Sequence, residues 1–240
     1  MQLIPAIDII EGKCVRLTQG DYSTMKVYNE DPLEMARQFE DNGLGRLHLV
    51  DLDGAKAGQV KNWKVLESIT SGTSLQVDFG GGIKTANDVD IVLGSGAQWA
   101  TVGSIAVRNE PLFVEWLTRY GADKFLLGAD VKDEKITVGG WLETTRIDIY
   151  DFIRKYIAHG VTHMFCTDVS RDGLLQGPSV ELYRNIIQAF PSLYFIASGG
   201  VSSMQDLHLL ADAGCSGAII GKAIYENKIS LQELKNFKAC

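Results

Sequence analysis

The feature that most constrains this chain is an internal repeat with a spacing of 118 positions. When the chain is shifted by that distance, Gly81-Gly82-Ile83 falls on Gly199-Gly200-Val201. The match continues without a gap through four further pairs: Asp88 and Asp206, Gly96 and Gly214, Ala100 and Ala218, Gly103 and Gly221. Strand, glycine-rich loop, helix, glycine and strand recur in the same order, so the fold must contain two similar halves.

Short apolar runs of this sequence alternate with longer segments of helical period, and most runs are apolar at consecutive positions. That pattern is typical of parallel strands covered on both faces. The expected strands are Leu3–Ile7, Leu47–Leu52, Leu75–Phe79, Trp99–Val102, Phe125–Asp130, His163–Asp168, Tyr194–Ala197 and Gly217–Ile220. Eight strands that are each followed by a helix predict a closed (β/α)8 TIM barrel, with an open doubly wound sheet as the alternative.

The repeat predicts one barrel domain over residues 1–240, built from half-barrels at approximately 1–121 and 122–240. The first helix is expected to begin at Asp31-Pro32, because proline suits the first helical position. Further helices are expected over Trp63–Ile69, Ala86–Leu93, Leu112–Tyr120, Ile149–Ile157, Val180–Phe190, Met204–Ala213 and Leu231–Phe237. Two polar stretches, 13–28 and 135–145, are expected to be long loops after strands one and five. Such loops can close over a substrate.

Composition excludes several classes of protein. The net charge of −7 argues against nucleic acid and anionic membranes as partners. The four cysteines form no C-x-x-C pair and no cluster with metal-ligand spacing, so we expect reduced, mostly buried thiols and no metal. No secretory leader is evident at the N-terminus, and no apolar run approaches the ~20 residues of a membrane span. We therefore expect a cytoplasmic protein.

The glycine-rich loops predict phosphate binding. Each loop follows a strand and precedes a helix, so its N–H groups can approach an anion near a favourable helix dipole. The expected donors are Gly81, Gly82, Gly103, Ser104, Gly199, Gly200, Gly221 and Lys222. Two register-matched copies indicate a ligand with a phosphate at each end, although glycine also permits tight turns without any ligand.

Two aspartates follow apolar strands at corresponding places in the two halves, Asp8 and Asp130. Active sites of such barrels lie at the carboxyl ends of the strands, where the repeat would place these carboxylates on opposite sides of one mouth. Different surroundings can make one carboxylate a base and the other an acid. The alternative is a pair of unrelated loop caps or salt-bridge partners.

Other polar residues near the mouth allow two interpretations each. The segments 167–173 and 51–55 could contact substrate or form ordinary turns. His48 could point into the barrel, whereas the other three histidines are expected to be structural or solvent-facing. Trp141 could stack on a ligand as a lid or could simply pack.

Several motifs of this chain resemble those of one enzyme family, the phosphoribosylformimino-5-aminoimidazole carboxamide ribotide isomerases of histidine biosynthesis. The resemblance covers essentially the whole chain. The matching segments are Ile4–Asp8, Val15–Tyr22, Leu47–Ala55, Gly80–Ile83, Cys166–Gly173 and Ser198–Val201. The Gln-Gly-Asp-Tyr and Ser-Arg-Asp-Gly motifs are fairly specific, whereas the glycine loops are shared with the sister cyclase.

The resemblance implies an Amadori rearrangement, in which an aminoaldose opens and becomes an aminoketose. Asp130 would be the general acid and Asp8 the general base, with Asp172 as a rival for the acid. The other positions that the resemblance assigns to substrate contact are Gly20, Trp141, Thr167 and Asp172. It implies no metal and no organic cofactor, and the substrate would be a small molecule with two phosphates. We expect a monomer.

Alternatives and departures accompany the resemblance. The chain could be the cyclase subunit of imidazole glycerol phosphate synthase, an isomerase that also accepts phosphoribosylanthranilate, or a non-catalytic phosphosugar-binding barrel. Lys84 stands where many members carry arginine, which makes bidentate contacts that lysine cannot make. Asp78-Phe79 replaces a shorter apolar approach to the glycines, and Leu174 replaces the more usual threonine.

Overall fold

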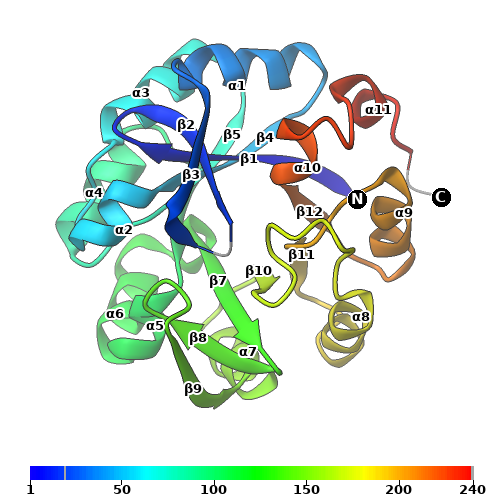
Figure 1. Cartoon of the computed structure of the whole chain (residues 1–240). Helices are drawn as coiled ribbons and strands as arrows, with labels where there is room; N and C mark the ends of the chain where they lie inside the picture. The colour runs from blue at the N-terminus through cyan, green and yellow to red at the C-terminus, as the bar shows by residue number, and fades with distance from the viewer. Residues whose placement is uncertain (19, 239–240) are drawn as a thin grey trace.

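Eight parallel strands close into a barrel in the computed structural model, which describes residues 1–18 and 20–238 (Figure 1). Strand β7 pairs with both β6 and β10, and this second pairing completes the ring. The barrel strands are β1 (Gln2–Ile10), β4 (Arg46–Asp51), β5 (Gln76–Gly80), β6 (Trp99–Val102), β7 (Phe125–Lys132), β10 (His163–Asp168), β11 (Tyr194–Ser198) and β12 (Gly217–Ile220). The predicted closed barrel is confirmed, and the open sheet is wrong.

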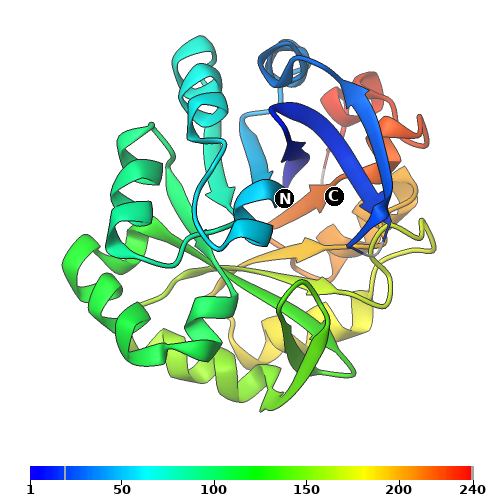
Figure 2. The same ribbon diagram turned by 60° about the vertical axis from the view of Figure 1, so that its left-hand side comes forward.

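Helices form an outer layer around the strands, as Figures 1 and 2 show from two directions. The longer helices are α1 (Pro32–Asp41), α3 (Trp63–Gly72), α4 (Ala86–Gly94), α6 (Glu110–Tyr120), α7 (Ile149–Ala158), α8 (Val180–Ala189) and α9 (Met204–Asp212). Short helical segments are α2 (Leu52–Ala57), α5 (Ser104–Arg108), α10 (Lys222–Tyr225), α11 (Leu231–Lys235) and the 3-10 turn η1 (Ala122–Lys124). The first helix begins as expected, because Asp31 accepts hydrogen bonds from the N–H groups of Leu33 and Glu34.

Two helices that are related by the repeat begin in the same way. Thr85 and Asp88 form a capping box at α4, and Ser203 and Asp206 form one at α9. Each box satisfies N–H groups that the first turn of a helix leaves without partners. This local equivalence supports the two half-barrels, whose boundaries stay a prediction.

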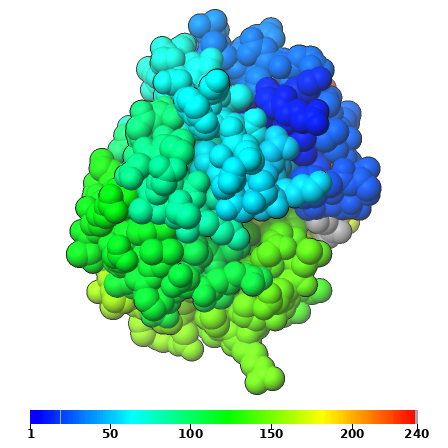
Figure 3. Space-filling view, turned by 90° about the vertical axis from the view of Figure 1, so that its left-hand side faces the viewer, coloured from blue at the N-terminus to red at the C-terminus, as the bar shows by residue number. Residues whose placement is uncertain are grey.

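The two expected loops are instead β-hairpins, so that prediction is wrong. Strands β2 (Lys13–Thr18) and β3 (Asp21–Asn29) form one antiparallel hairpin after β1, and β8 (Lys135–Val138) and β9 (Glu143–Asp148) form another after β7. Nearly all of β3 is exposed, since a two-stranded ribbon in solvent has no face to bury. Its polar sequence therefore reflected exposure rather than irregular backbone. Figure 3 shows the first hairpin, in blue, beside the cyan surface of α2.

The core has two parts. The larger part lies between the strands and the helices, and it includes Phe39, Phe79, Phe113, Trp116 and Phe195. A smaller cluster fills the barrel, as expected for this fold. Its members are Ile4, Ala6, Trp99, Leu126, Phe165, Ile196 and Ile219. Polar side chains interrupt this inner cluster, namely Arg46, His48 and Asp78, all buried.

Three of the cysteines and His163 lie where the sequence predicts them to be structural. Cys14, Cys166 and Cys215 are free and buried as expected, and Cys240 lies outside the described residues. His163 stacks on Tyr194 with ring centroids 4.8 Å apart, which fits a structural role. In the described part of the chain, no helix combines the length and the apolar character that crossing a membrane requires.

Candidate active site

Asp8 lies near the end of β1, opposite Val15 of the first hairpin. Its Oδ2 accepts a hydrogen bond of 2.7 Å from Nη1 of Arg16, and both side chains are about five-sixths buried. The pair holds a carboxylate and a cation together at the barrel mouth. Arg16 belongs to the matching segment Val15–Tyr22, but its place in the sequence indicates no role, because only the pairing of β2 with β1 brings it over Asp8.

Asp130 lies near the end of β7, next to Thr167 of β10 in the sheet register. Burial raises the pKa of Asp130, while hydrogen bonds from Trp141 and Thr167 and the nearby His48 act in the opposite direction. The indole Nε1 of Trp141 donates to Oδ2 of Asp130 over 2.8 Å. The structure therefore brings together Asp130, Trp141 and Thr167, three residues that the sequence indicates separately.

The first and second hairpins meet above this site. A β-carbon placed on Gly20 would lie 3.3 Å from the Trp141 ring, so the two residues are in contact. Trp141 has a positive φ of 70°, which is unusual for a residue with a side chain. Gln19, which belongs to the same motif as Gly20, lies outside the described residues. The contact between the hairpins covers part of the mouth.

Asp172 lies in the turn that follows β10, where its N–H donates to the carbonyl of Asp168. Burial raises the pKa of Asp172 to about 6; the nearby charges of Asp8 and Asp130 also raise it, whereas Arg16 and Lys222 lower it. A carboxyl group with this pKa is partly protonated near neutral pH. Asp172 is thus close enough to both other aspartates to respond to their charges.

The glycine loops occupy matching positions in the two halves, and close packing explains part of their composition. Gly81, Gly82, Gly199 and Gly200 all have φ between 83° and 100°. A β-carbon on Gly81 would lie 2.1 Å from the carbonyl oxygen of Asp51, and one on Gly200 would lie 2.4 Å from that of Gly177. Glycine is therefore required here for turn geometry with or without a ligand. Phosphate binding stays a prediction.

The later loops of the two halves also correspond. Gly103 precedes Ser104 of α5, and Gly221 precedes Lys222 of α10. Nζ of Lys222 donates to the carbonyl of Gly173 over 2.8 Å, which ties α10 to the turn that carries Asp172. The guanidinium of Arg16 covers Gly221: a β-carbon there would lie 1.2 Å from Nη2. The second glycine region thus adjoins the Arg16–Asp8 pair.

Asp51 and Asp168 stabilise turns, which is the second of the two interpretations that the sequence allowed for the segments 51–55 and 167–173. Asp51 is fully buried, and its oxygens accept from Gly54, Lys61 and Asn62. Asp168 accepts from Ser170 and Ser179. These carboxylates fix the chain after β4 and β10.

Lys84 is exposed, with its side chain near Gly58.

His48 points into the barrel, which is one of the two possibilities that the sequence allowed for this residue. Nδ1 of His48 lies 2.5 Å from Oδ1 of Asp78, and its ring packs edge-on against Phe165 at 5.2 Å. Phe165 belongs to β10 on another side of the ring of strands. His48 therefore forms part of the floor beneath the mouth.

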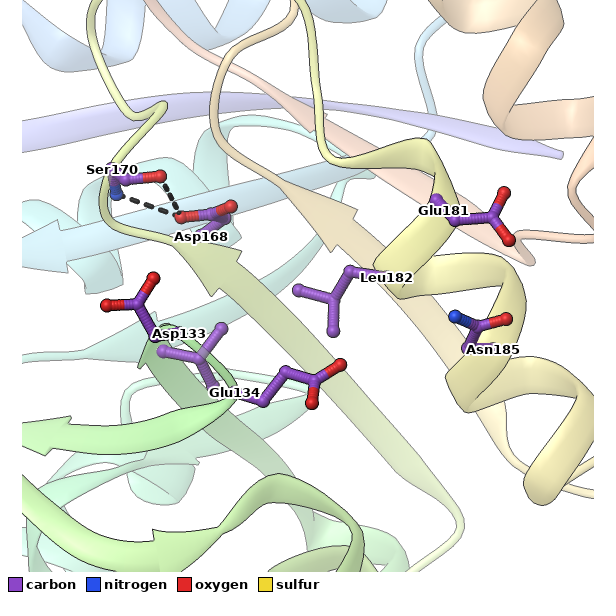
Figure 4. A pocket seen from close by; sticks show the side chains of 8 residues that line it. Asp133, Glu134, Asp168, Ser170, Glu181, Leu182 and Asn185 are labelled. Carbon is purple, nitrogen blue, oxygen red and sulfur yellow. Dashed lines mark hydrogen bonds between the residues drawn. The ribbon is translucent and has the colours of Figure 1, made fainter.

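A separate cavity of about 240 Å³ lies between the β7–β8 turn and α8 (Figure 4). Four of the residues around it are acidic, namely Asp133, Glu134, Asp168 and Glu181. Negative charge of this density disfavours an anionic ligand. Within residues 1–18 and 20–238, no group of three or more histidine, cysteine or acidic side chains is arranged to hold a metal ion.

Fold and site define the class of (β/α)8-barrel enzymes that act on a small molecule at the barrel mouth. The chain belongs to the histidine biosynthesis protein family, whose pattern matches residues 2–230.

The chain is similar to several curated relatives over essentially its full length. A protein of Parabacteroides distasonis is 55% identical over 237 residues, 99% of each chain. One of Azobacteroides pseudotrichonymphae is 55% identical over 240 residues, 100% of each, and one of Flavobacterium psychrophilum is 53% identical over 237 residues, 99% of this chain and 98% of its own. Each is named as an isomerase of an imidazole-4-carboxamide that carries two phosphoribosyl groups. The predicted isomerase of histidine biosynthesis is confirmed.

Proposed function

We propose that this chain converts the phosphoribosylformimino aminoimidazole carboxamide ribotide to its phosphoribulosyl form by an Amadori rearrangement. The observation that carries the chemical assignment is the grouping of Asp8, Asp130 and Asp172 in different surroundings around one mouth. Such differences allow one carboxyl group to remain a base while another holds a proton. A rearrangement with one proton donation and one proton removal needs both an acid and a base.

Asp130 would donate a proton to the ribose ring oxygen as the bond from that oxygen to C1 breaks. The nitrogen lone pair then forms the Schiff base. Asp8 would remove the proton from C2, and the electron pair of that C–H bond would form the enolamine, which becomes the ketose after proton transfer to C1. Each step by a placed carboxyl group contributes roughly 10²–10⁴ in rate.

One observation favours Asp172 as the acid instead. Its pKa of about 6 leaves a larger fraction protonated near neutral pH than an ordinary aspartate would have. Asp130, in contrast, accepts the hydrogen bond of Trp141 and would help to keep the second hairpin over the substrate. Asp130 and Asp172 are therefore both candidates, and their variants must be compared.

The two glycine regions would hold the two phosphates. Within the described part of the chain, the N–H groups of Gly82 and Gly200 donate to no backbone carbonyl, so they are free to bind an anion. Binding both ends of an elongated substrate would place its centre over the aspartates, so binding energy would be used for positioning. Gly103, Ser104, Gly221 and Lys222 would supply further donors.

A coupled spectrophotometric assay tests the function. Purified protein would receive the formimino ribotide together with a cyclase and ammonia, and phosphoribosylanthranilate would be supplied in parallel. We expect turnover that requires the added cyclase. Conversion of the ketose without added cyclase would identify a cyclase, and ligand binding without any turnover would identify a phosphosugar-binding barrel. We also expect a monomer, which light scattering would test.

A further inference from the structure

The inner cluster of the barrel contains a carboxylate that the proposed reaction does not use. Asp78 of β5 is fully buried, and its Oδ1 lies 2.5 Å from Nδ1 of His48 and 2.9 Å from the hydroxyl of Thr101. These partners belong to the two strands that flank β5, namely β4 and β6. The contact is therefore part of the barrel sheet and does not depend on a mobile loop.

A positive charge lies on the other side of this carboxylate. Nη2 of Arg46 is 3.8 Å from Oδ2 of Asp78, and the guanidinium packs over the Trp99 ring at 4.1 Å. In the described part of the chain, neither of these two atoms has a hydrogen-bond partner. Burial of a lone carboxylate would be strongly unfavourable, so Arg46 offsets its charge. Arg46, Asp78 and His48 form a polar column along the barrel interior.

The upper end of this column reaches the proposed site. His48 packs against Phe165, and it lies close enough to Asp130 to influence the pKa of that carboxyl group. Because Nδ1 of His48 is engaged by Asp78, the opposite ring nitrogen, Nε2, is turned away from the carboxylate. Within the described residues, Nε2 has no hydrogen-bond partner, and the side chain keeps 10% of its surface exposed.

We propose that Asp78 is a positioning residue for the isomerisation and that it acts through His48. A carboxylate can only accept from Nδ1, so it fixes the proton on Nδ1 and prevents the ring from turning over. Nε2 is then held at the floor of the mouth, available to a hydroxyl group of the bound ribose. This role rests on the proposed function, since it describes how the same site orders its floor.

Asp78→Asn is the main test, because it keeps the shape and replaces a partner that can only accept with one that can also donate. The side-chain amide can donate to Nδ1 and move the proton to Nε2, which is the wrong arrangement. We expect kcat to fall about tenfold or more while KM changes less than about threefold, since binding at the phosphates would remain. His48→Gln should give a similar loss.

The double variant Asp78→Asn/His48→Gln separates positioning from general destabilisation. If Asp78 acts only through His48, the double variant should be no slower than His48→Gln by more than about twofold. Asp88→Asn is the matched control, since Asp88 is also a buried carboxylate but caps α4 outside the barrel. It should lower stability and leave kcat unchanged.

Nitrogen-15 NMR of histidine-labelled wild type provides a measurement that needs no folded variant at position 78. The His48 signals, assigned with His48→Gln, should show a protonated Nδ1. A neutral ring with its proton on Nε2 would overturn the proposal, as would independent, multiplicative losses in the double variant. If the wild type shows no turnover, the proposed function fails, whereas the NMR result still reports on the contact between Asp78 and His48.

Discussion

Arg16 is bonded to Asp8 over 2.7 Å and at the same time covers Gly221. One guanidinium thus adjoins both the proposed base and a proposed phosphate loop. A phosphate that arrives beside Gly221 would compete with Asp8 for this cation. Occupation of the second phosphate site would in this way alter the contact between Arg16 and Asp8.

Gly221→Ala should disturb this arrangement, because its β-carbon would collide with Arg16 at 1.2 Å. The guanidinium would have to move, so kcat/KM should fall about tenfold or more. Gly94→Ala is the control, since a β-carbon at that position of α4 would meet nothing within 4 Å. Steady-state kinetics of both variants would measure the difference, and equal values would contradict a role for the Arg16 position.

Asp8→Asn should abolish turnover and leave ligand affinity nearly intact. The amide cannot accept the C2 proton but keeps the shape that the phosphate loops surround, so the loss should approach the roughly 10²–10⁴ of a placed base. Turnover would come from the coupled assay and affinity from calorimetry with the ketose product. Turnover within about tenfold of the wild type would exclude Asp8 as the base.

The pH dependence of Asp130→Asn and Asp172→Asn should identify the acid. If Asp172 is the acid, wild-type kcat should decline as pH rises through about 6, since the protonated form is then lost. Asp172→Asn would be nearly inactive, and Asp130→Asn would keep that decline. The opposite pattern would assign the acid role to Asp130.

The raised pKa of Asp172 also predicts that the stability of the protein depends on pH. Its pKa is about 6 in the folded chain and 3.8 ordinarily, so the folded state binds more protons between these values. The free energy of unfolding therefore loses a contribution as pH rises through that window. Asp172→Asn should gain stability relative to the wild type between pH 4 and 7, by on the order of 1–2 kcal/mol. Urea unfolding of both proteins at pH 4 and pH 7 would measure this gain. A difference in the free energy of unfolding that is the same at the two pH values would contradict the prediction.

Trp141→Phe should separate the hydrogen bond to Asp130 from the aromatic surface. Loss of the Nε1 donor should lower kcat by about tenfold, whereas Trp141→Ala should also raise KM because the cover over the mouth is lost. Wild-type tryptophan fluorescence should change on ligand binding. Trp141→Phe should lose that change, because Trp99 lies in the inner cluster of the barrel and Trp63 and Trp116 pack in the larger core.

Most of the barrel could be predicted because its strands carry their own signal. The ranges expected for β6, β10 and β12 agree with the structure at both ends. Apolar residues at consecutive positions are a local property of a strand that is covered on both faces. The outer strands of the hairpins, β3 and β9, lacked this signal, since their residues are paired by backbone hydrogen bonds while most of their side chains are exposed or only partly buried.

The candidate site was predicted in part. Asp8 and Asp130 could be selected from their positions after strands, whereas the role expected for Trp141 came from the resemblance. The contact between Trp141 and Asp130 agrees with a shared mouth. Asp51 and Asp168 occupy equally suggestive positions, but their oxygens are used by neighbouring loops. A position after a strand says where a carboxylate lies, and only the folded loops decide what it bonds.

The sequence by itself determined the closed barrel and the doubled glycine loops, because periodicity and spacing are written along the chain. Its motifs indicated the family by resemblance. The tertiary structure decided that Arg16 meets Asp8 and that Asp78 meets His48, since these contacts need strands to pair in one register. It also decided the raised pKa of Asp172, which depends on burial and on carboxylates that are distant in the sequence. Electrostatic surroundings are a property of three-dimensional packing, and no local pattern contains them.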